Sequence, residues 1–314
     1  MAKGKKRREK VLITGGLGFI FSHVTEHLVK SGYDVAVIDN CSTGSHAEIV
    51  DGSFKFYKED FAEKGAWKRA VEAKPDYLIH AAGITDVDYS IKHPEETFIN
   101  NVMCNLNAFE AARKLKNIKK LVYVSTDEVY GECEHRKHEG EIIFPRNPYS
   151  CTRAIGSLMR YAFDNTYKEI FDKTAETRKC NIFGPRQDTR KIMPQIIASL
   201  KGTHSIPLQN KGEGYREYLY VKNIPPLTEL VMKKGWRTYN ITNGEGFTVK
   251  ELIAKTESLT GKKVKTHPST RPGHDSAYRM DNTRIVTELG WKPLYSFEEG
   301  LREYLELEGI PVVE

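Results

Sequence analysis

Residues 11–21 read Val-Leu-Ile-Thr-Gly-Gly-Leu-Gly-Phe-Ile-Phe, and this stretch decides the fold that we expect. The apolar run at 11–14 predicts a buried strand, and an amphipathic segment at 22–31 predicts a helix. Glycines between a strand and a helix let the backbone approach a diphosphate at the helix N-terminus. Because many turns carry two glycines, this cluster indicates a dinucleotide site only if its surroundings agree.

The surroundings of this turn do agree, because apolar runs alternate with amphipathic stretches through the first half of the chain. The apolar runs lie at 11–14, 35–39, 54–57, 77–80 and 121–125, and the helical patterns at 22–31, 65–73, 94–114 and 152–167. Such alternation predicts βαβ units and a mostly parallel sheet. We therefore expect an α/β fold: a Rossmann-type doubly wound parallel sheet with a smaller C-terminal α/β lobe.

The second half of the chain is less regular. Glycine and proline interrupt it repeatedly, Pro225-Pro226 among them, and short helical patterns lie near 192–201, 248–259 and 281–289. We place the boundary near 175–185, which gives a basic tail at 1–10, a first domain at 11–180 and a second lobe at 181–314. The runs at 218–221 and 239–241 could return as strands, so the chain can cross between the lobes more than once.

Charge and composition fit an ordinary globular protein. Of the 314 residues, 39% are hydrophobic and 29% are charged, and the net charge is +6. Much of the positive excess lies in the tail, at Lys3, Lys5, Lys6, Arg7, Arg8 and Lys10. We interpret this tail as a solvated segment, with a nucleic-acid or membrane patch as the alternative. No nucleic acid or membrane is expected as a partner.

The cysteines indicate a reducing compartment. The chain has 5 of them, an odd number, without a CxxC pair or zinc-finger spacing. No run approaches the length of a membrane span, and the basic start leads into a strand rather than a signal-peptide core. A cytoplasmic location is therefore expected.

Asp39 ends the second predicted strand, at about the spacing of an acidic residue that binds a cofactor ribose. No arginine is adjacent to it, which favours NAD over NADP because a 2′-phosphate would be repelled. The alternative is that Asp39 caps a turn beside Asn40 and Ser42. Further candidate cofactor contacts follow the third and fourth predicted strands: Asp60, Phe61, Ala81 and Ala82.

Residues 125–131 read Ser-Thr-Asp-Glu-Val-Tyr-Gly and follow the strand predicted at 121–125. An acid and a base side by side at the end of such a strand can remove water from a substrate. Eighteen residues after 131 comes Tyr149, spaced four residues from the cation Arg153. The alternative for the Asp127-Glu128 pair is a cluster that merely starts a helix or turn.

These motifs together resemble the extended short-chain dehydrogenase/reductase family, and within it dTDP-glucose 4,6-dehydratases. The resemblance lies in Thr14-Gly-Gly-Leu-Gly-Phe-Ile, His80-Ala-Ala, Ser125-Thr-Asp-Glu-Val-Tyr-Gly, Pro148-Tyr-Ser-x-x-Arg, Asn181-Ile-Phe-Gly-Pro, Arg216-Glu-Tyr-Leu-Tyr-Val, Arg271-Pro-Gly-His-Asp and Glu288-Leu-Gly-Trp-Lys-Pro. It covers nearly the whole chain after the tail. The Asp-Glu pair discriminates: related epimerases lack both carboxylates, and related decarboxylases usually retain only the glutamate.

The resemblance implies NAD-dependent dehydration of a nucleotide-linked hexose, dTDP-glucose or a close analogue. Tyr149 would take the C4 hydroxyl proton while hydride passes to NAD. Glu128 would then remove the C5 proton and Asp127 would protonate the leaving C6 hydroxyl, after which hydride returns to C6. Thr126 would bond the C4 oxygen, and Ser125 would line the nicotinamide side. Two carboxyl groups with separated pKa values suit these roles.

The resemblance also implies binding residues and a homodimer. Those for the cofactor are Gly15, Gly18, Phe19, Ile20, Asp39, Asn40, Ser42, Thr43, Gly44, Asp60, Phe61, Ala81, Ala82, Asn101, Ser125, Tyr149 and Arg153. Those for the substrate are Ser90, Thr126, Asn181, Lys191, Arg216, Arg271, His274 and Tyr278. Relatives commonly dimerise through helices like that at 94–114 and the one after Tyr149.

Several positions depart from the family pattern. Arg153 stands where lysine is usual, and its planar fork cannot reproduce a compact ammonium, so we expect weakened catalysis. Phe21 replaces a small residue where the helix packs closely on the strand, so we expect a shifted helix or a narrowed diphosphate site. The other departures are Gln209, Asn210, Cys104 and Ala277.

These departures leave alternatives to the dehydratase open. The first is a dehydratase-like binding or scaffolding protein with impaired catalysis, which Arg153 and Phe21 favour. The second is an epimerase, which would use Tyr149 but would leave the paired carboxylates without a purpose.

Overall fold

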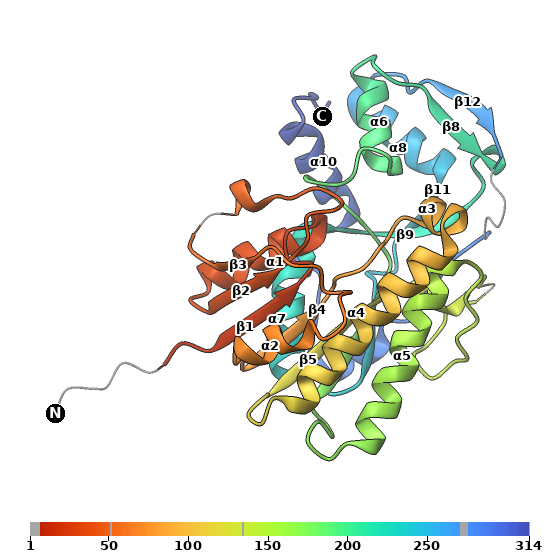
Figure 1. The fold of residues 1–314 in the computed structure, drawn as a ribbon. Helices are drawn as coiled ribbons and strands as arrows, with labels where there is room; N and C mark the ends of the chain where they lie inside the picture. The colour runs from red at the N-terminus through yellow and green to blue at the C-terminus, as the bar shows by residue number, and fades with distance from the viewer. Residues whose placement is uncertain (1–6, 51, 134, 271–275, 314) are drawn as a thin grey trace.

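A sheet of seven parallel strands forms the centre of the described part of the chain (Figure 1). The computed structural model describes residues 7–50, 52–133, 135–270 and 276–313. The strands are β1 (Lys10–Thr14), β2 (Asp34–Ile38), β3 (Lys55–Tyr57), β4 (Tyr77–His80), β5 (Lys120–Thr126), β6 (Thr174–Lys179) and β10 (Thr238–Ile241). Their order is β10-β6-β5-β4-β1-β2-β3, so the chain reverses direction across the sheet between β1 and β4. This doubly wound arrangement confirms the predicted fold class and places ligands at the carboxyl ends of the strands.

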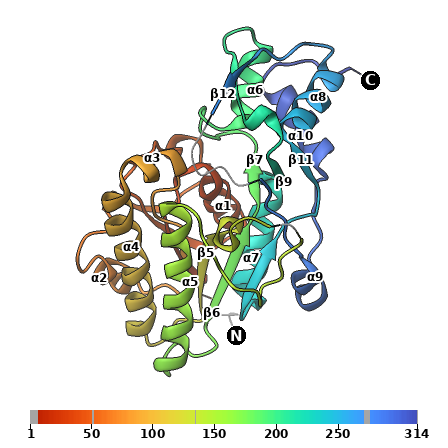
Figure 2. The same cartoon turned by 90° about the vertical axis from the view of Figure 1, so that its right-hand side faces the viewer.

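Helices cover both faces of the sheet (Figures 1 and 2). On one side α4 (Pro94–Lys114) packs against α2 (Trp67–Glu72) and α5 (Pro148–Thr166), and the short α3 (Val87–Lys92) packs on α5. On the other side α7 (Ile224–Lys234) packs against α1 (Phe19–Lys30) and α9 (Thr283–Leu289). Among the described residues, no helix is both long and apolar enough to cross a membrane.

A second lobe lies beyond the carboxyl ends of the strands. Its elements are β7 (Asn181–Phe183), β9 (Tyr215–Tyr220) and β11 (Gly246–Thr248) in one sheet, β8 (Ile206–Gln209) paired with β12 (Thr266–Ser269), and the helices α6 (Ile192–Leu200), α8 (Val249–Thr260) and α10 (Phe297–Leu307). The short 3-10 helices are η1 (Ala47–Ile49), η2 (Asp127–Tyr130), η3 (Asn210–Gly212) and η4 (Val221–Asn223). β10 is an edge strand of the central sheet, and α7 packs on α1 and β5. The chain therefore passes from β7 and β9 of the second lobe back to the central sheet.

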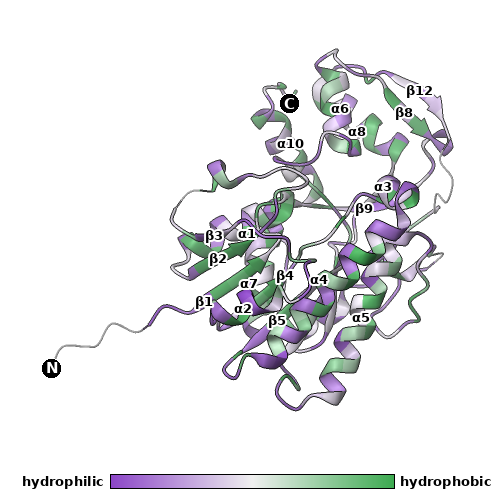
Figure 3. Cartoon of the chain, in the orientation of Figure 1, coloured by the Kyte–Doolittle hydropathy of each residue, from purple (hydrophilic) through white to green (hydrophobic). Residues whose placement is uncertain are grey.

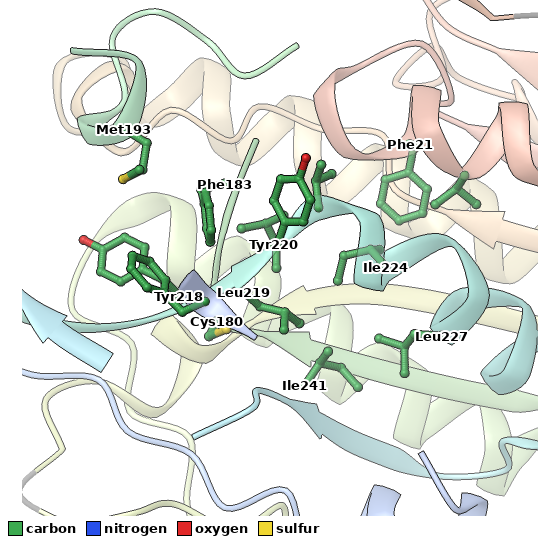
Figure 4. Packing of buried hydrophobic residues seen from close by; sticks show 14 of the residues in the cluster. Phe21, Cys180, Phe183, Met193, Tyr218, Leu219, Tyr220, Ile224, Leu227 and Ile241 are labelled. Carbon is green, nitrogen blue, oxygen red and sulfur yellow. The ribbon is translucent and has the colours of Figure 1, made fainter. Parts of the chain in front are cut away.

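Buried side chains join the two lobes. One apolar cluster runs from β1 and α1 through Tyr220 and Ile224 into the second lobe, and a separate cluster lies between the sheet and α4. Figure 3 shows the strands β1 and β2 as hydrophobic, as buried parallel strands require. Figure 4 shows Phe21 pointing from α1 toward Tyr220 and Ile224 within the first cluster. The cofactor turn and the second lobe therefore share one core.

Two elements differ from the sequence-based expectation. We interpreted Pro225-Pro226 as an interruption, but α7 begins at Ile224 with prolines in its first turn. Proline is tolerated there because the first N–H groups of a helix have no acceptor within the helix. The strand β6 was not predicted as such, because its sequence Thr-Ala-Glu-Thr-Arg-Lys is mostly polar although every residue of it is buried.

Candidate active site

The predicted acid–base pair lies at the carboxyl end of β5, in the middle of the sheet. Thr126 ends the strand and caps η2, which carries Asp127 and Glu128. The Thr126 hydroxyl donates to Asp127 Oδ1 at 3.1 Å, and the Glu128 N–H approaches Thr126 Oγ1 at 3.4 Å. The Thr126 side chain thus holds the Asp127 carboxyl group and the backbone of Glu128 at the start of one helical turn.

Asp127 is the most deeply buried carboxyl of this group, with 3% of its surface exposed. Burial raises the pKa of Asp127 to about 8, and the neighbouring Glu128 carboxylate adds to the rise. Burial disfavours the charged form of a carboxyl group, so Asp127 holds a proton at neutral pH. A protonated carboxyl group can act as a general acid.

Glu128 is half-buried and bonded to the neighbouring helix. Its Oε2 accepts a hydrogen bond of 2.9 Å from the amide of Asn147. Asn147 caps α5, where its side chain and that of Ser150 form a capping box and Pro148 occupies the first turn. The start of α5 is therefore fixed relative to Glu128, and Tyr149 lies in that first turn.

Tyr149 is buried beside Arg153 on α5. Burial raises the pKa of the Tyr149 phenol, while the Arg153 guanidinium, 5.6 Å from the phenol ring centroid, opposes the rise. The backbone N–H of Tyr149 donates to the hydroxyl of Ser90 at 3.2 Å, and Ser90 is itself fully buried. This contact gives Ser90 a positioning role; its contact with substrate stays a prediction.

Arg153 fits into the site without a carboxylate partner among the described residues. Its Nη1 lies 3.5 Å from the carbonyl oxygen of Val124, which is at most a weak hydrogen bond. Its Nη2 packs against Gly83, where an added Cβ atom would lie only 3.0 Å from that nitrogen. The bulk of the guanidinium is therefore accommodated by a glycine that follows β4.

A buried polar network links the strands behind the site to α5. The ring of His80 contacts Thr14 Oγ1 at 2.7 Å and Asn105 Oδ1 at 3.1 Å, and burial lowers the pKa of His80 to about 3. Asn101 donates to Thr152 Oγ1 at 2.8 Å and accepts the N–H of Ile84 at 2.7 Å. Asn101 thus supports the segment after β4; its predicted cofactor contact remains a prediction.

The glycine-rich turn has the geometry of a dinucleotide site. Gly15 has a φ of +70°, and a Cβ atom there would come within 2.8 Å of the backbone of Ala82. Gly18 caps α1, so the free N–H groups of Phe19 and Ile20 lie in the first turn of a helix. The turn after β1 and the segment after β4 therefore meet at Gly15 and Ala82, and the cofactor contacts expected of Gly15, Ala81 and Ala82 stay predictions.

Asp39 lies directly after β2 and both of its oxygens are engaged. It accepts the N–H of Leu17 at 3.0 Å and the N–H of Cys41 at 2.8 Å. The second contact is the turn that we considered as the alternative. Because each carboxylate oxygen can accept two hydrogen bonds, these contacts leave capacity for a ribose hydroxyl.

The other predicted cofactor residues lie along the same edge of the sheet. Asn40 donates to Asp60 Oδ2 at 3.0 Å, and Phe61 is buried. Ser42, Thr43 and Gly44 are exposed in the loop after β2. The buried Ser125 hydroxyl has no hydrogen-bond partner among the described residues. This orphaned hydroxyl, the glycine turn and Asp39 fit a bound dinucleotide.

Of the predicted substrate residues that the structure describes, Ser90 lies in α3 and Thr126 ends β5, whereas the others lie in or beside the second lobe. Asn181 begins β7, Lys191 caps α6, and the Arg216 guanidinium lies 4.3 Å from the centroid of the Tyr278 ring. Arg271 and His274 lie outside the described residues. The remaining departures are placed as follows: Cys104 is buried in α4, Gln209 ends β8, Asn210 begins η3 and Ala277 pairs with Tyr215.

One residue of the site was missed by the sequence reasoning. Lys179, at the end of β6, is buried and aligned with Thr126 of β5. Its Nζ lies 5.6 Å from the centroid of the Phe21 ring. The sequence signal for Lys179 would have been its position at the end of a buried strand. That signal was missed because β6 itself was not predicted.

The chain is similar in sequence to nucleotide-sugar 4,6-dehydratases. A family model described as GDP-mannose 4,6 dehydratase matches residues 12–304. The chain is 30% identical over 334 residues to the dTDP-glucose 4,6-dehydratase of Salmonella typhimurium, with 95% of this chain and 92% of that protein covered. It is also 30% identical to an Arabidopsis thaliana trifunctional UDP-glucose 4,6-dehydratase/UDP-4-keto-6-deoxy-D-glucose 3,5-epimerase/UDP-4-keto-L-rhamnose-reductase, with 95% of this chain covered, but spans only 47% of its length.

Solved structures of similar proteins contain NAD. A UDP-glucose 4-epimerase of Thermus thermophilus in complex with NAD has a TM-score of 0.89 and 29% identity, covering 96% of this chain and 99% of that one. A dTDP-glucose 4,6-dehydratase of Streptomyces venezuelae with NAD bound has a TM-score of 0.87 and 27% identity, covering 94% and 95%. The fold and the NAD cofactor are thus common to these dehydratases and epimerases.

Proposed function

The chain belongs to the family described by the GDP-mannose 4,6-dehydratase model, within the extended short-chain dehydrogenases/reductases, and we propose that it is an NAD-dependent nucleotide-sugar 4,6-dehydratase. The observation that carries this proposal is the buried Asp127 carboxyl group beside Glu128 at the carboxyl end of β5, where burial raises the pKa of Asp127. A dehydratase needs an acid for the leaving hydroxyl and a base for the proton removed, next to each other. An epimerase needs neither.

The residues of the chain divide the reaction between them. Tyr149 takes the proton of the C4 hydroxyl, and Thr126 holds the C4 oxygen. Glu128 removes the C5 proton, which a C4 ketone makes acidic, and Asp127 gives its proton to the departing C6 hydroxyl. NAD, when bound, supplies the redox chemistry by accepting hydride from C4 and returning it to C6.

We assign the binding of the cofactor and the substrate to residues at the carboxyl ends of the strands and in the second lobe. Gly15, Phe19 and Asp39 would hold the cofactor, with the free hydroxyl of Ser125 toward the nicotinamide. Arg216 and Lys191 would meet the substrate's phosphates, because cationic side chains suit phosphate oxygens. The favoured substrate is dTDP-glucose or a close nucleotide-linked hexose, such as UDP-glucose.

A 4-epimerase is the second candidate, and the high similarity to the Thermus thermophilus UDP-glucose 4-epimerase favours it. The epimerase reaction would use Tyr149 and Thr126 at the C4 oxygen, but neither Asp127 nor Glu128. The burial and raised pKa of Asp127 would then serve no step, whereas they suit the acid of a dehydration. We therefore prefer the dehydratase.

The proposal is tested by incubating the purified protein with dTDP-glucose and, separately, UDP-glucose. We expect a 4-keto-6-deoxy product, detected by mass as loss of water. The variant Asp127→Asn, with the fold intact, should lose most of this product. Absence of water loss from either nucleotide-hexose in a folded protein would sink the dehydratase proposal, and a C4 epimer instead would establish the second candidate.

A further inference from the structure

Lys179 is a buried cation that the proposed reaction does not use. Only 5% of its surface is exposed, and its Nζ donates to Thr177 Oγ1 at 2.6 Å. The same Nζ lies 5.6 Å from the centroid of the Phe21 ring, within reach of a cation–π contact. Phe21, which departs from the family pattern in the first turn of α1, thus contacts the buried lysine at the end of β6.

The surroundings of Lys179 do not supply a negative charge. Among the described residues, no carboxylate lies within ion-pair distance of Lys179 or of Arg153, which is also buried. Burial, followed by the charge of Arg153, lowers the pKa of Lys179 to about 7, while the Cys180 thiol acts weakly in the opposite direction. Two buried cations without an anion are unfavourable. A bound ligand that carries a negative charge would therefore stabilise the site.

The position of Lys179 identifies that charge. Phe21, against which it lies, belongs to the first turn of α1, where free backbone N–H groups favour a phosphate. Lys179 is also aligned across the sheet with Thr126, at the same edge of the sheet as the glycine turn. The Lys179 amine therefore reaches the helix that follows the glycine turn, where the cofactor's diphosphate is expected.

We propose that Lys179 binds the diphosphate of the dinucleotide cofactor and takes up one proton from solvent when the cofactor binds. This inference rests on the proposed NAD-dependent function. The step is a protonation: the amine lone pair forms an N–H bond with a solvent proton, and nothing is oxidised or reduced. The diphosphate stabilises the ammonium that burial and Arg153 disfavour in the free protein.

The expected pH dependence follows from this coupling. At pH 6 Lys179 already carries its proton, so cofactor binding should take up none. At pH 8 the amine is mostly neutral, so binding should take up close to one proton. Asp127 also titrates in this range, with a pKa of about 8, so its contribution must be separated.

Calorimetric titration with NAD and with ADP-ribose, at pH 6 and 8 in two buffers of different ionisation enthalpy, tests the proposal. The wild type should take up close to one proton at pH 8 with both ligands, because both carry the diphosphate. Asp127→Asn should keep this uptake. Lys179→Met should abolish it and weaken both ligands by about tenfold or more.

The matched control is Lys120→Met, because Lys120 is also a buried lysine, at the opposite end of β5, where it donates to the carbonyl oxygen of Asp172 at 3.0 Å. It should leave affinity and proton uptake unchanged. If Lys179→Met does not fold, proton uptake by the wild type is compared with that of Lys179→Arg. The arginine stays protonated at both pH values, so this variant should bind the ligands without taking up a proton. Dinucleotide binding without proton uptake at pH 8 would overturn this inference alone, whereas failure of the folded wild type to bind NAD would overturn the proposed function with it.

Discussion

Asp127 is a single side chain whose burial serves the proposed chemistry and lowers stability. An unfolded chain ionises this carboxyl group above about pH 4, whereas the folded protein keeps it protonated up to about pH 8. The folded state therefore binds more protons between these values, and its stability falls as pH rises through them. The acid of the reaction is thus retained at a cost in folding free energy.

Asp127→Asn should remove this cost. At pH 8 we expect the free energy of unfolding of the variant to exceed that of the wild type by an amount on the order of a few kcal/mol, and its unfolding temperature to be higher. At pH 4 the two proteins should differ little. Thermal unfolding followed by circular dichroism across this pH range measures the difference. An equal shift at both pH values would mean that the ionisation of Asp127 is not the cause.

Arg153 is the departure that bears most directly on the rate. The phenol of Tyr149 has a raised pKa despite the nearby guanidinium, so only a small fraction of it is ionised at neutral pH. In Arg153→Lys the positive charge is compact rather than spread over a planar fork. We expect the variant to lower the pKa of Tyr149 and to raise kcat at pH 7, by about tenfold for each unit of that fall.

The pH–rate profile of Arg153→Lys is the measurement. Because the pKa of Tyr149 lies above that of Asp127, the rate should rise up to about pH 8 and fall only where most of the phenol is ionised. In Arg153→Lys the falling limb should move to lower pH with the pKa of Tyr149, while the rise that levels near pH 8, set by Asp127, should stay in place. A lower kcat without a displaced falling limb would show that the site has adapted to arginine.

Helices and strands that show in consecutive residues were predicted well from the sequence. A strand whose polar side chains are compensated by partners distant in the chain was not. The helix at 94–114 and the strand at 77–80 coincide with α4 and β4, because caps, charges and apolar runs are visible in consecutive residues. β6 escaped because Glu176 is neutralised by Arg178 at 2.8 Å and bonded by Ser157 at 2.6 Å. Such compensation is visible only once α5 lies against the strand.

The candidate site divides in the same way. The carboxylates, Tyr149 and the glycine turn belong to short motifs, so their residues could be predicted from the sequence. The protonated state of Asp127, the free hydroxyl of Ser125 and the contact of Lys179 with Phe21 depend on burial and on residues distant in the chain. Figure 4 shows the ring of Phe21 directed into the core, and the shifted helix or narrowed diphosphate site that we expected from it stays a prediction.

Close packing of α5 on the sheet is what positions Tyr149 and Arg153. A Cβ atom at Gly156 would overlap the hydroxyl of Tyr123 on β5 and lie 2.9 Å from the Asn105 amide on α4. Gly156→Ala should therefore push α5 outward, lower stability by about 1–3 kcal/mol and reduce activity further than stability alone explains.

Chemical unfolding and kcat at a temperature where the variant is folded test this prediction. Ala162→Gly, on the exposed side of the same helix, is the control, and its cost of about 1 kcal/mol should leave kcat unchanged. An active site insensitive to Gly156→Ala would mean that α5 is not held by this contact.

At the scale of the whole molecule, the two lobes are tied together beside the cofactor turn. His23 of α1 contacts the carbonyl oxygen of Pro185 at 3.1 Å, and Arg186 pairs with Glu26 at 2.7 Å. These contacts join α1 to the segment that follows β7 in the second lobe. Together with the shared apolar core, they hold the glycine turn and the second lobe in place relative to each other.

The outer surface of α4 and α5 predicts the assembly. Ile99, Leu158 and Tyr161 on these helices are 59%, 61% and 67% exposed, respectively, and the two helices pack side by side (Figure 2). We propose that this face forms a homodimer, because exposed apolar side chains on paired helices are best buried against a second copy.

Leu158→Glu should convert the dimer to a monomer, measured by light scattering. The control is Leu294→Glu, because Leu294 is 67% exposed but lies before α10, away from this face. A wild-type protein that is monomeric at micromolar concentration, or a dimer untouched by Leu158→Glu, would contradict the proposed interface.

The central claim is that the Asp127-Glu128 pair makes this chain a dehydratase with internal hydride return. The most direct measurement uses dTDP-glucose carrying deuterium at C4, with the product analysed by NMR. We predict a 4-keto-6-deoxy product with the deuterium in its C6 methyl group. Deuterium returned to C4 of an epimerised sugar, or an unchanged substrate with folded, NAD-loaded protein, would contradict it.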